Sequence, residues 1–301
     1  MTEFVDIHAD DYALSEHSDN DILALCKAGK LTSISILPNM DRFADAVQAF
    51  KTAQPAFVQP VRVSVHLNVM EGRCCANKEL VPDLVDADGF FTVSWGKLVA
   101  WSYNPFMYAR IKKQLITEIC AQTEAVIACG LIDRAHVRFD SHQHPHMIPI
   151  VYAALLAAID TMHYGVDFIR NSEDPLHLYF AEWALYPSYS AINAVKCIIL
   201  NVYSWRVRHA LHKRNLPCTV LCGVFFSGHM DALRVQRVLP RFVRFAHKKN
   251  RSVEVLFHPG TMLASEITPE FSKPGFIAFH LDEGRKIEYS AVNTVQYGAM
   301  Q

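Results

Sequence analysis

Residues 135–162 read AHVRFDSHQHPHMIPIVYAALLAAIDTM, and this stretch predicts the repeating unit of the fold. Its first part, Ala135–Asp140, is short and ends in polar residues, which is typical of a strand. A polar segment with three histidines follows it. The apolar run from Met147 contains Pro149 and is shorter than the roughly 20 residues that span a bilayer, so we expect the buried helix Pro149–Met162. The stretch therefore predicts a strand, a polar loop and a helix in that order.

The same alternation of a short apolar run and a longer helical segment recurs along the chain. Strands that alternate with helices pair in parallel through right-handed crossovers, which gives an α/β sheet or barrel. The expected strands are Phe4–His8, Ser33–Pro38, Val61–Val69, Ala135–Asp140, Val166–Arg170, Thr219–Phe226 and Ser252–Phe257. The expected helices are Asn20–Ala28, Asp41–Thr52, Ala109–Cys129, Pro149–Met162, Ser190–His212 and Leu233–Lys248.

Two connections between these elements are long, Glu71–Pro105 and Asn171–Pro217. We expect the first to be a loop rich in aromatic residues and the second to carry a helix. Long connections in compact α/β proteins are typically active-site walls or oligomer contacts. No segment resembles a flexible linker. We therefore expect one domain over residues 1–301, with insertions at about 71–105 and 171–217.

The composition is that of a folded protein without a preference for nucleic acid. The 301 residues are 51% hydrophobic and 20% charged, with a net charge of -1 and a pI near 6.9, which excludes a disordered chain and disfavours a nucleic-acid partner. The 8 cysteines form no CxxC pair, so we expect reduced thiols. The N-terminal residues lack the pattern of a secretory signal, which predicts a cytoplasmic protein.

Polar residues follow nearly every predicted strand. The carboxyl ends of parallel strands meet at one rim, and ligands bind beyond that rim. The chain has 15 histidines, and several of them occur at these ends. The polar residues that we expect at the rim are His8, Asp10, Asp11, Asn39, His66, Asn68, Asp140, Ser141, His142, His144, His146, Arg170, Asn171, Glu173, Ser227, His229 and His258.

Two groups among these residues indicate metal or proton chemistry. Asp10 and Asp11 are adjacent, so in a regular strand they point to opposite faces and reach one pocket only where the chain turns. One carboxylate can then bind a metal while its neighbour remains a free base. In an extended chain His142, His144 and His146 share a face, and three imidazoles at a strand end suggest a metal site.

A catalytic metal site keeps coordination positions open for water and substrate. Two histidines and one carboxylate from three separate strands leave such positions. His66 lies in an otherwise apolar strand, where a lone histidine is more often a hydrogen-bonded core residue. Beside the aspartate pair and His142, it would complete a ligand set of this kind.

The order of these motifs resembles the YdjC-like carbohydrate deacetylases, which include chitooligosaccharide deacetylases. The resemblance implies a TIM-like (β/α) barrel that is seven-stranded or distorted. Two positions depart from the common pattern of the family, namely His8 in place of Asn and Tyr12-Ala13 in place of Phe-Gly. The motifs that carry the resemblance are Ala9-Asp10-Asp11-Tyr12, Thr32-Ser33, Asn39, His66-Leu67-Asn68, Asp140-Ser-His-Gln-His-Pro-His146, Arg170 and His258-Pro259-Gly260.

The resemblance also implies roles for individual residues. Asp11, His66 and His142 match the ligands of one divalent metal ion, Mg or Zn. Asp10 matches the general base and His258 the general acid. Aromatic side chains suit sugar rings, which makes tryptophans of the long loop candidates for a pocket wall. The further residues expected at the substrate or behind the ligands are Arg170, Asp140, His144, His146, Asn39, Trp95 and Trp101.

These roles predict an enzyme that removes an N-acetyl group from an amino sugar or a short N-acetylglucosamine oligosaccharide with a metal-activated water. The ligand set leaves two alternatives, a non-catalytic carbohydrate-binding protein on the same barrel and a 2-His-1-carboxylate iron oxygenase. The expected partner is an N-acetylated sugar, without nucleic acid or membrane. The sequence leaves open whether the protein forms a homodimer.

Overall fold

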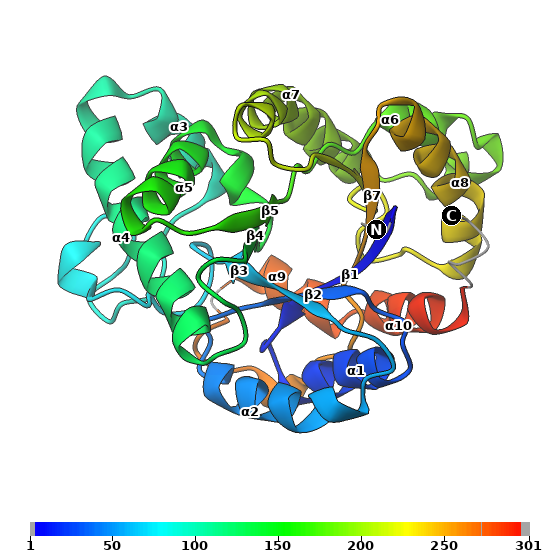
Figure 1. Ribbon diagram of the computed structural model, residues 1–301, viewed down its shortest axis with the longest axis horizontal. Coiled ribbons are helices and arrows are strands. Elements are labelled where there is room, and N and C mark those ends of the chain that lie inside the picture. Colours follow the sequence, from blue (N-terminus) through cyan, green and yellow to red (C-terminus); the bar gives the residue numbers. More distant parts are fainter. Residues whose placement is uncertain (1–3, 272, 296–301) are drawn as a thin grey trace.

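The computed structural model, which describes residues 4–271 and 273–295, contains one sheet of seven parallel strands. The order across the sheet is β5-β4-β3-β2-β1-β7-β6. The sheet curls around a common interior (Figure 1). The strands are β1 (Val5–Tyr12), β2 (Ser33–Ile36), β3 (Arg62–Leu67), β4 (Val137–Ser141), β5 (Val166–Ile169), β6 (Thr219–Cys222) and β7 (Ser252–Phe257).

The sheet is an open barrel, because its two edge strands do not pair with each other in the described part of the chain. The central strand β1 lies between β2 and β7, with His8 opposite Ser33 on one side and Leu256 on the other. The edges are β5 and β6, and the chain between them forms helices instead of a further strand. This confirms the predicted fold class, an incomplete barrel of parallel strands.

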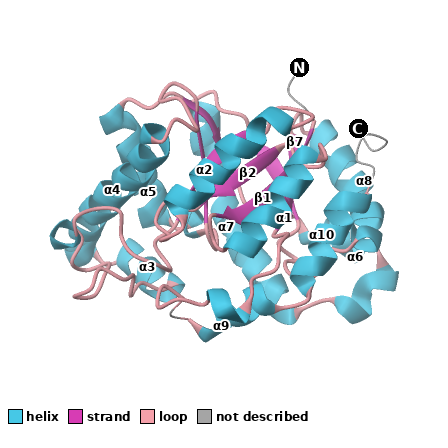
Figure 2. Ribbon diagram, turned by 90° about the horizontal axis from the view of Figure 1, so that it is seen from below, coloured by secondary structure: helices cyan, strands magenta, loops and turns pink. Residues whose placement is uncertain are grey.

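Helices lie around the outside of the curled sheet (Figure 1, Figure 2). Their apolar faces pack against the strands, as Ile22, Leu25 and Cys26 of the first helix show by their burial. No helix of the described residues is both long and apolar enough to cross a membrane. The helices outside the second insertion are α1 (Glu16–Lys27), α2 (Phe43–Ala53), α3 (Trp95–Ser102), α4 (Pro105–Ala128), α5 (Pro149–Met162), α8 (Ala232–Lys248), α9 (Pro274–Leu281) and α10 (Gly284–Thr294).

Most expected elements are present with shifted ends, and two of them, α5 and β7, have the predicted bounds. The expected strand Thr219–Phe226 is too long, because β6 ends at Cys222 and Gly223 follows with φ of 138°. The expected strand Phe4–His8 is too short. β1 continues to Tyr12 and therefore includes both aspartates of the predicted site.

The two long connections contain more regular structure than predicted. Residues 71–105, expected as a loop, include α3 and a 3-10 turn at Lys78–Leu80. Ser94 begins α3, because its side chain accepts a hydrogen bond from the N–H of Lys97 at 3.3 Å. Residues 171–217 include α6 (Leu176–Phe180), a 3-10 helix (Trp183–Ser188) and α7 (Ala191–Lys213).

The helix α7 is fixed beside the open edge of the barrel by one face. The backbone N–H of Asp174 donates to Oδ1 of Asn201 at 2.9 Å, and Nδ2 of Asn201 donates to the carbonyl of Asp174 at 2.8 Å. Leu200, Val207 and Leu211 of the same face are buried. The opposite face of α7 remains exposed.

Two helices near the C-terminus, α9 and α10, are absent from the sequence-based expectation. The segment of α9 is apolar on nearly all sides, so it lacks the 3.6-residue pattern that indicates a surface helix. Pro274 occupies its first position, where a missing N–H costs nothing. Both helices follow β7 and lie near the carboxyl ends of the strands.

We predict that Gly165→Ala destabilises the protein. A Cβ at this position would lie 2.2 Å from the carbonyl oxygen of Ala135, and the carbonyl of Gly165 accepts a hydrogen bond from the N–H of Val137 at 2.8 Å. Two adjoining segments would have to separate, at a cost of roughly 1–3 kcal/mol in the free energy of unfolding measured with urea. Gly96→Ala within α3, with its nearest neighbour at 4.0 Å, is the control. Equal stability of both variants would contradict this account.

Candidate functional site

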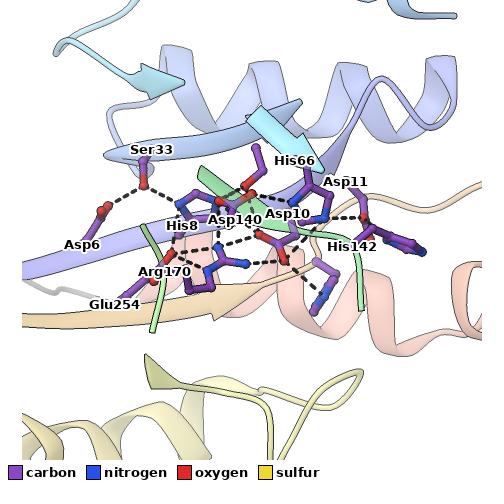
Figure 3. A network of polar contacts seen from close by, with 12 residues as sticks. Asp6, His8, Asp10, Asp11, Ser33, His66, Asp140, His142, Arg170 and Glu254 are labelled. Atoms are coloured by element: carbon purple, nitrogen blue, oxygen red, sulfur yellow. Dashed lines mark hydrogen bonds and ion pairs between the residues drawn. The ribbon is translucent and has the colours of Figure 1, made fainter. Parts of the chain in front are cut away.

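The carboxyl ends of β1, β3 and β4 bring Asp11, His66 and His142 together (Figure 3). The register of β1 shifts near its end, and Asp11 has φ of 67°. The chain therefore turns at the aspartate pair, as the sequence required. As a result, Asp10 and Asp11 line the same cavity instead of pointing to opposite faces.

The geometry of Asp11, His66 and His142 fits one cation. Oδ1 of Asp11 lies 2.8 Å from Nδ1 of His142 and 3.2 Å from Nε2 of His66. One potential ligand atom from each buried side chain lies within 4.8 Å of the other two. Nε2 of His66 is buried without a hydrogen-bond partner among the described residues, and a cation would satisfy it. One carboxylate and two imidazoles are donors that zinc and related ions accept.

Asp140 orients His66 from behind. Nδ1 of His66 donates to Oδ1 of Asp140 at 2.7 Å, which directs Nε2 toward Asp11. Burial disfavours the charged imidazole, but the carboxylates of Asp10 and Asp140 outweigh burial and raise the pKa of His66 to about 10. Burial also opposes ionisation of Asp11, yet His142 holds the pKa of that carboxyl well below its usual range. A proton therefore competes with a cation at His66.

A fully buried guanidinium holds Asp10. Nη1 and Nη2 of Arg170 donate to the two carboxylate oxygens of Asp10 at 2.9 and 2.8 Å. Nε and Nη2 also donate to Oε1 of Glu254 at 3.0 and 2.8 Å. Burial opposes both charges, but Arg170 lowers the pKa of Asp10 well below its usual range. Asp10 in turn raises the pKa of Arg170 well above its usual value.

A second group of potential ligands, His8, Asp10 and Asp140, lies beside the first. This group already contains a cation, because Nη2 of Arg170 lies 2.8 Å from Asp10 and 3.3 Å from Asp140. A metal ion there would be repelled at short range. His8 lies beneath Asp10 and makes a 2.7 Å hydrogen bond with Ser33 through Nδ1, so this departure from the family pattern is part of the packed interior. The first group is therefore the better metal site.

His258 faces Asp10 from the chain just after β7. Its Nε2 lies 4.0 Å from Oδ2 of Asp10, and its side chain is 13% exposed. Glu288 of α10 accepts a hydrogen bond from the backbone N–H of His258 at 2.6 Å and lies 3.7 Å from its Nδ1. Burial opposes ionisation of Glu288, but the charge of Arg285 together with the contacts to His258 lowers the pKa of Glu288 to about 2. A charged carboxylate thus fixes the position of His258.

The site lies at the bottom of a cavity of about 640 Å³. We call Asp10, Asp11, His66 and His142 the cavity floor. Three segments outside the sheet form the walls, namely the loop with α3, the insertion helix α7 and the helix α9. The wall residues include Trp95, Ile192, Val195, Lys196, Ile199, Phe276, Phe279 and His280.

The three histidines of the 140–146 segment do not share one face, contrary to the expectation from an extended chain. β4 ends at Ser141, and His144 has φ of 60°, so the chain turns between them. His142 reaches the cavity floor and His144 lines the cavity. His146 is buried elsewhere, and its Nε2 donates to the carbonyl of Arg170 at 2.9 Å. His146 therefore supports the chain that follows β5.

The remaining expected site residues divide between the cavity and its surroundings. Trp95 lines the cavity, and its Nε1 donates to the carbonyl of Gln143 at 3.0 Å. Asn39 is buried and donates to the carbonyl of Glu71 at 2.8 Å, so it fixes the start of the long loop. Trp101 packs against the core and is not among the cavity-lining side chains.

His280 is a cavity residue that the sequence motifs do not mark. It lies on α9, with Nε2 at 3.6 Å from Oδ2 of Asp11. Burial lowers the pKa of His280 well below its usual value. No local motif marks α9 or α7 as cavity walls. The only available signals were the length of the second insertion and the nearness of α9 to His258 in the chain.

The protein is thus an open α/β barrel with a group of carboxylate and imidazole side chains at the carboxyl ends of its parallel strands. The model of the family described as YdjC-like protein matches residues 5–299. The chain is therefore a member of the YdjC-like family, which confirms the resemblance found in the sequence.

Curated relatives carry the name carbohydrate deacetylase. The human protein is 27% identical over 261 residues, which cover 84% of this chain and 74% of that protein. The mouse protein is 26% identical over 165 residues, covering 54% of this chain and 49% of that protein. The Geobacillus stearothermophilus protein is 28% identical over 155 residues, or 50% and 55% of the two chains. The chain thus spans about half the length of several of these relatives.

A solved structure from Enterococcus faecalis V583 has the same fold. It is described as a candidate cellobiose-phosphate cleavage protein, and the match covers 98% of both chains with a TM-score of 0.55. The sequence identity is 15%, so this similarity concerns the fold alone.

We predict that His66→Ala and His142→Ala each lose affinity for a divalent cation, because each removes one of the three potential ligands. The expected loss is at least about 10-fold, since the loss of an outer hydrogen-bond partner alone often costs that much. Equilibrium dialysis against Zn²⁺ or Mg²⁺ with elemental analysis measures it. His136→Ala is the control, with a side chain that is 69% exposed. Full metal stoichiometry in both cavity variants would rule out this ligand assignment.

Proposed function

We propose that this protein is a metal-dependent carbohydrate deacetylase that hydrolyses the N-acetyl amide of an amino sugar or a short N-acetylglucosamine oligosaccharide. The observation that carries the proposal is the position of Asp10 and His258, 4.0 Å apart, beside the three potential metal ligands. Amide hydrolysis needs a base for the attacking water and an acid for the departing amine. The relatives named carbohydrate deacetylase support the substrate class.

Asp11, His66 and His142 would hold one divalent cation. Such an ion, when bound, polarises the acetyl oxygen and lowers the pKa of a bound water from 15.7 towards about 7. Magnesium prefers oxygen ligands, whereas imidazole suits zinc and other transition ions. Because two of the three donors are imidazoles, we propose zinc ahead of magnesium.

Asp10 would accept the proton of the attacking water. Its carboxylate lines the cavity but is not one of the three ligands, so it is free to act as a base. Arg170 keeps it ionised and fixes both of its oxygens through two hydrogen bonds. Asp140 keeps Nε2 of His66 directed toward Asp11. His66 would therefore serve as a ligand beside Asp11, while Asp10 would serve as the base.

His258 would donate a proton to the departing amine. Without this proton the tetrahedral intermediate reverts, because an amine anion is a poor leaving group. Glu288 holds the backbone of His258 so that its ring faces Asp10 across the cavity. His144 and Trp95 border the same space and would contact the sugar.

The two alternatives account for fewer of these features. An iron oxygenase would use the 2-His-1-carboxylate ligands but not the neighbouring pair of Asp10 and His258. A protein that only binds sugar would not need a carboxylate held ionised by a buried arginine. The cytoplasmic location and the single domain remain predictions from the sequence, which left the oligomeric state open.

We predict that Asp10→Asn retains the metal but loses turnover, because the amide preserves the shape and cannot accept the proton. The rate of acetate release from N-acetylglucosamine oligosaccharides should fall by about 10²–10⁴, while elemental analysis gives unchanged metal content. Asp167→Asn, at a side chain that is 51% exposed, is the control. Activity equal to that of the parent would place the base elsewhere.

We predict that His258→Ala affects amides far more than activated esters. Acetate release from an N-acetyl sugar should fall by about 10²–10⁴ because the amine is no longer protonated. Hydrolysis of 4-nitrophenyl acetate should fall much less, because 4-nitrophenolate leaves without a proton. Parallel kinetic assays with the two substrates test the difference. Equal losses on both would contradict the role of a general acid.

A further inference from the structure

The insertion helix α7 gives one side of the cavity an aliphatic wall. Ile192, Val195 and Ile199 of this helix line the same cavity as the floor aspartates. Their exposed fractions are 81%, 56% and 41%. Contact of large aliphatic side chains with water is unfavourable, so a ligand that covers these side chains gains binding free energy.

The opposite side of the cavity is aromatic and lies directly on the reacting groups. The ring of Phe276 contacts the ring of His142 at a centroid distance of 4.9 Å, and the ring of Phe279 contacts that of His258 at 5.3 Å. A molecule that presents its acyl group to the cavity floor therefore sits between this aromatic side and α7.

The aliphatic wall suits a hydrocarbon better than sugar hydroxyls. A hydroxyl group needs hydrogen-bond partners when it leaves water. Among the side chains that α7 contributes to the cavity, Lys196 is the polar one, whereas Ile192, Val195 and Ile199 offer neither donors nor acceptors. The wall thus complements an apolar group attached to the sugar.

We propose that the substrate is an N-acetylated amino sugar that carries a hydrocarbon aglycone, and that Ile192, Val195 and Ile199 form the subsite for this hydrocarbon. The proposal rests on the function proposed above and names its substrate class more closely. The acetyl group lies at the cavity floor, and the aglycone leaves the cavity along α7.

The exposed stripe continues along α7 beyond the cavity. Val202 lies three residues after Ile199 on the same helical face and is 66% exposed. Trp205, in the next turn, is 65% exposed. At 1.5 Å per residue, the stripe from Ile192 to Val202 is about 15 Å long, so a hydrocarbon that outgrows the cavity remains in contact with apolar side chains.

Contact with the cavity distinguishes this occupant from a second copy of the chain. Ile192, Val195 and Ile199 border the space that any substrate of the floor residues must enter. A dimer partner seated on the same side chains would obstruct that space. The hydrocarbon is therefore assigned to the substrate, and a dimer is an outcome that the experiment can detect.

The test measures binding of N-acetylglucosamine glycosides with methyl, butyl and hexyl aglycones. Calorimetry with Zn²⁺-loaded Asp10→Asn protein avoids turnover, and kcat/KM is measured with the parent. The Kd should fall about twofold to fourfold per methylene, because a buried methylene is worth about 0.8 kcal/mol and 1.4 kcal/mol is a factor of ten. N-hexanoylglucosamine methyl glycoside, which places the chain on the acyl side, should gain nothing.

Two variants locate the subsite. The double change Val195→Asn with Ile199→Asn should flatten the dependence of Kd on chain length, since both side chains line the cavity. Ile198→Asn is the matched control, because Ile198 is 52% exposed on the same helix but is not among the cavity-lining residues. It should leave the dependence unchanged.

The outcomes separate this proposal from the one on which it rests. A Kd independent of aglycone length, with acetate still released from the methyl glycoside, overturns the subsite and leaves the deacetylase function. Absence of acetate release from every glycoside overturns the function, while a Kd that still falls with chain length supports the subsite. A flat Kd series, with a dimer that the double variant converts to a monomer, would assign the stripe to an interface between copies.

Discussion

The buried guanidinium of Arg170 joins four strands of the sheet through ion pairs. It follows β5 and contacts carboxylates of three other strands, Asp10 on β1, Asp140 on β4 and Glu254 on β7. An unpaired buried charge would cost several kcal/mol, so these contacts favour the sheet curvature that brings the four side chains together. The same contacts keep Asp10 ionised. The fold and the proposed chemistry therefore rest on one set of ion pairs.

The gap between the edge strands β5 and β6 leaves room for the second insertion, whose helix α7 forms one wall of the cavity. No strand in the described residues closes the gap between β5 and β6, and α7 is fixed there through Asn201 and Asp174. Strand ends supply the polar floor, whereas α7 and α9 supply apolar walls. The sheet thus supplies the groups of the proposed reaction, and segments outside it supply the surfaces that would contact the proposed substrate.

Sequence patterns predicted the elements that have a strong local signal. The helix Pro149–Met162 has the expected bounds, because Pro149 favours a helix start and the apolar run that follows is too short to span a membrane and is typical of a buried helix. The signal failed where distant contacts decide the backbone. The segment after Ser141 turns at His144, so His146 is buried outside the cavity that His142 and His144 line, although an extended chain would have placed all three on one face. The helix α9 was missed because it is apolar on nearly all sides.

The alternation of strand and helix patterns along the sequence was enough to predict the parallel α/β class and to mark Asp10, Asp11, His66 and His142 as rim residues. The motif order also identified the family. Only the tertiary structure decided which polar groups meet, because hydrogen-bond partners such as Arg170 for Asp10 come from segments far apart in the chain. It also decided that α7 and α9 border the cavity, because their position depends on how far the sheet curls and where it stays open.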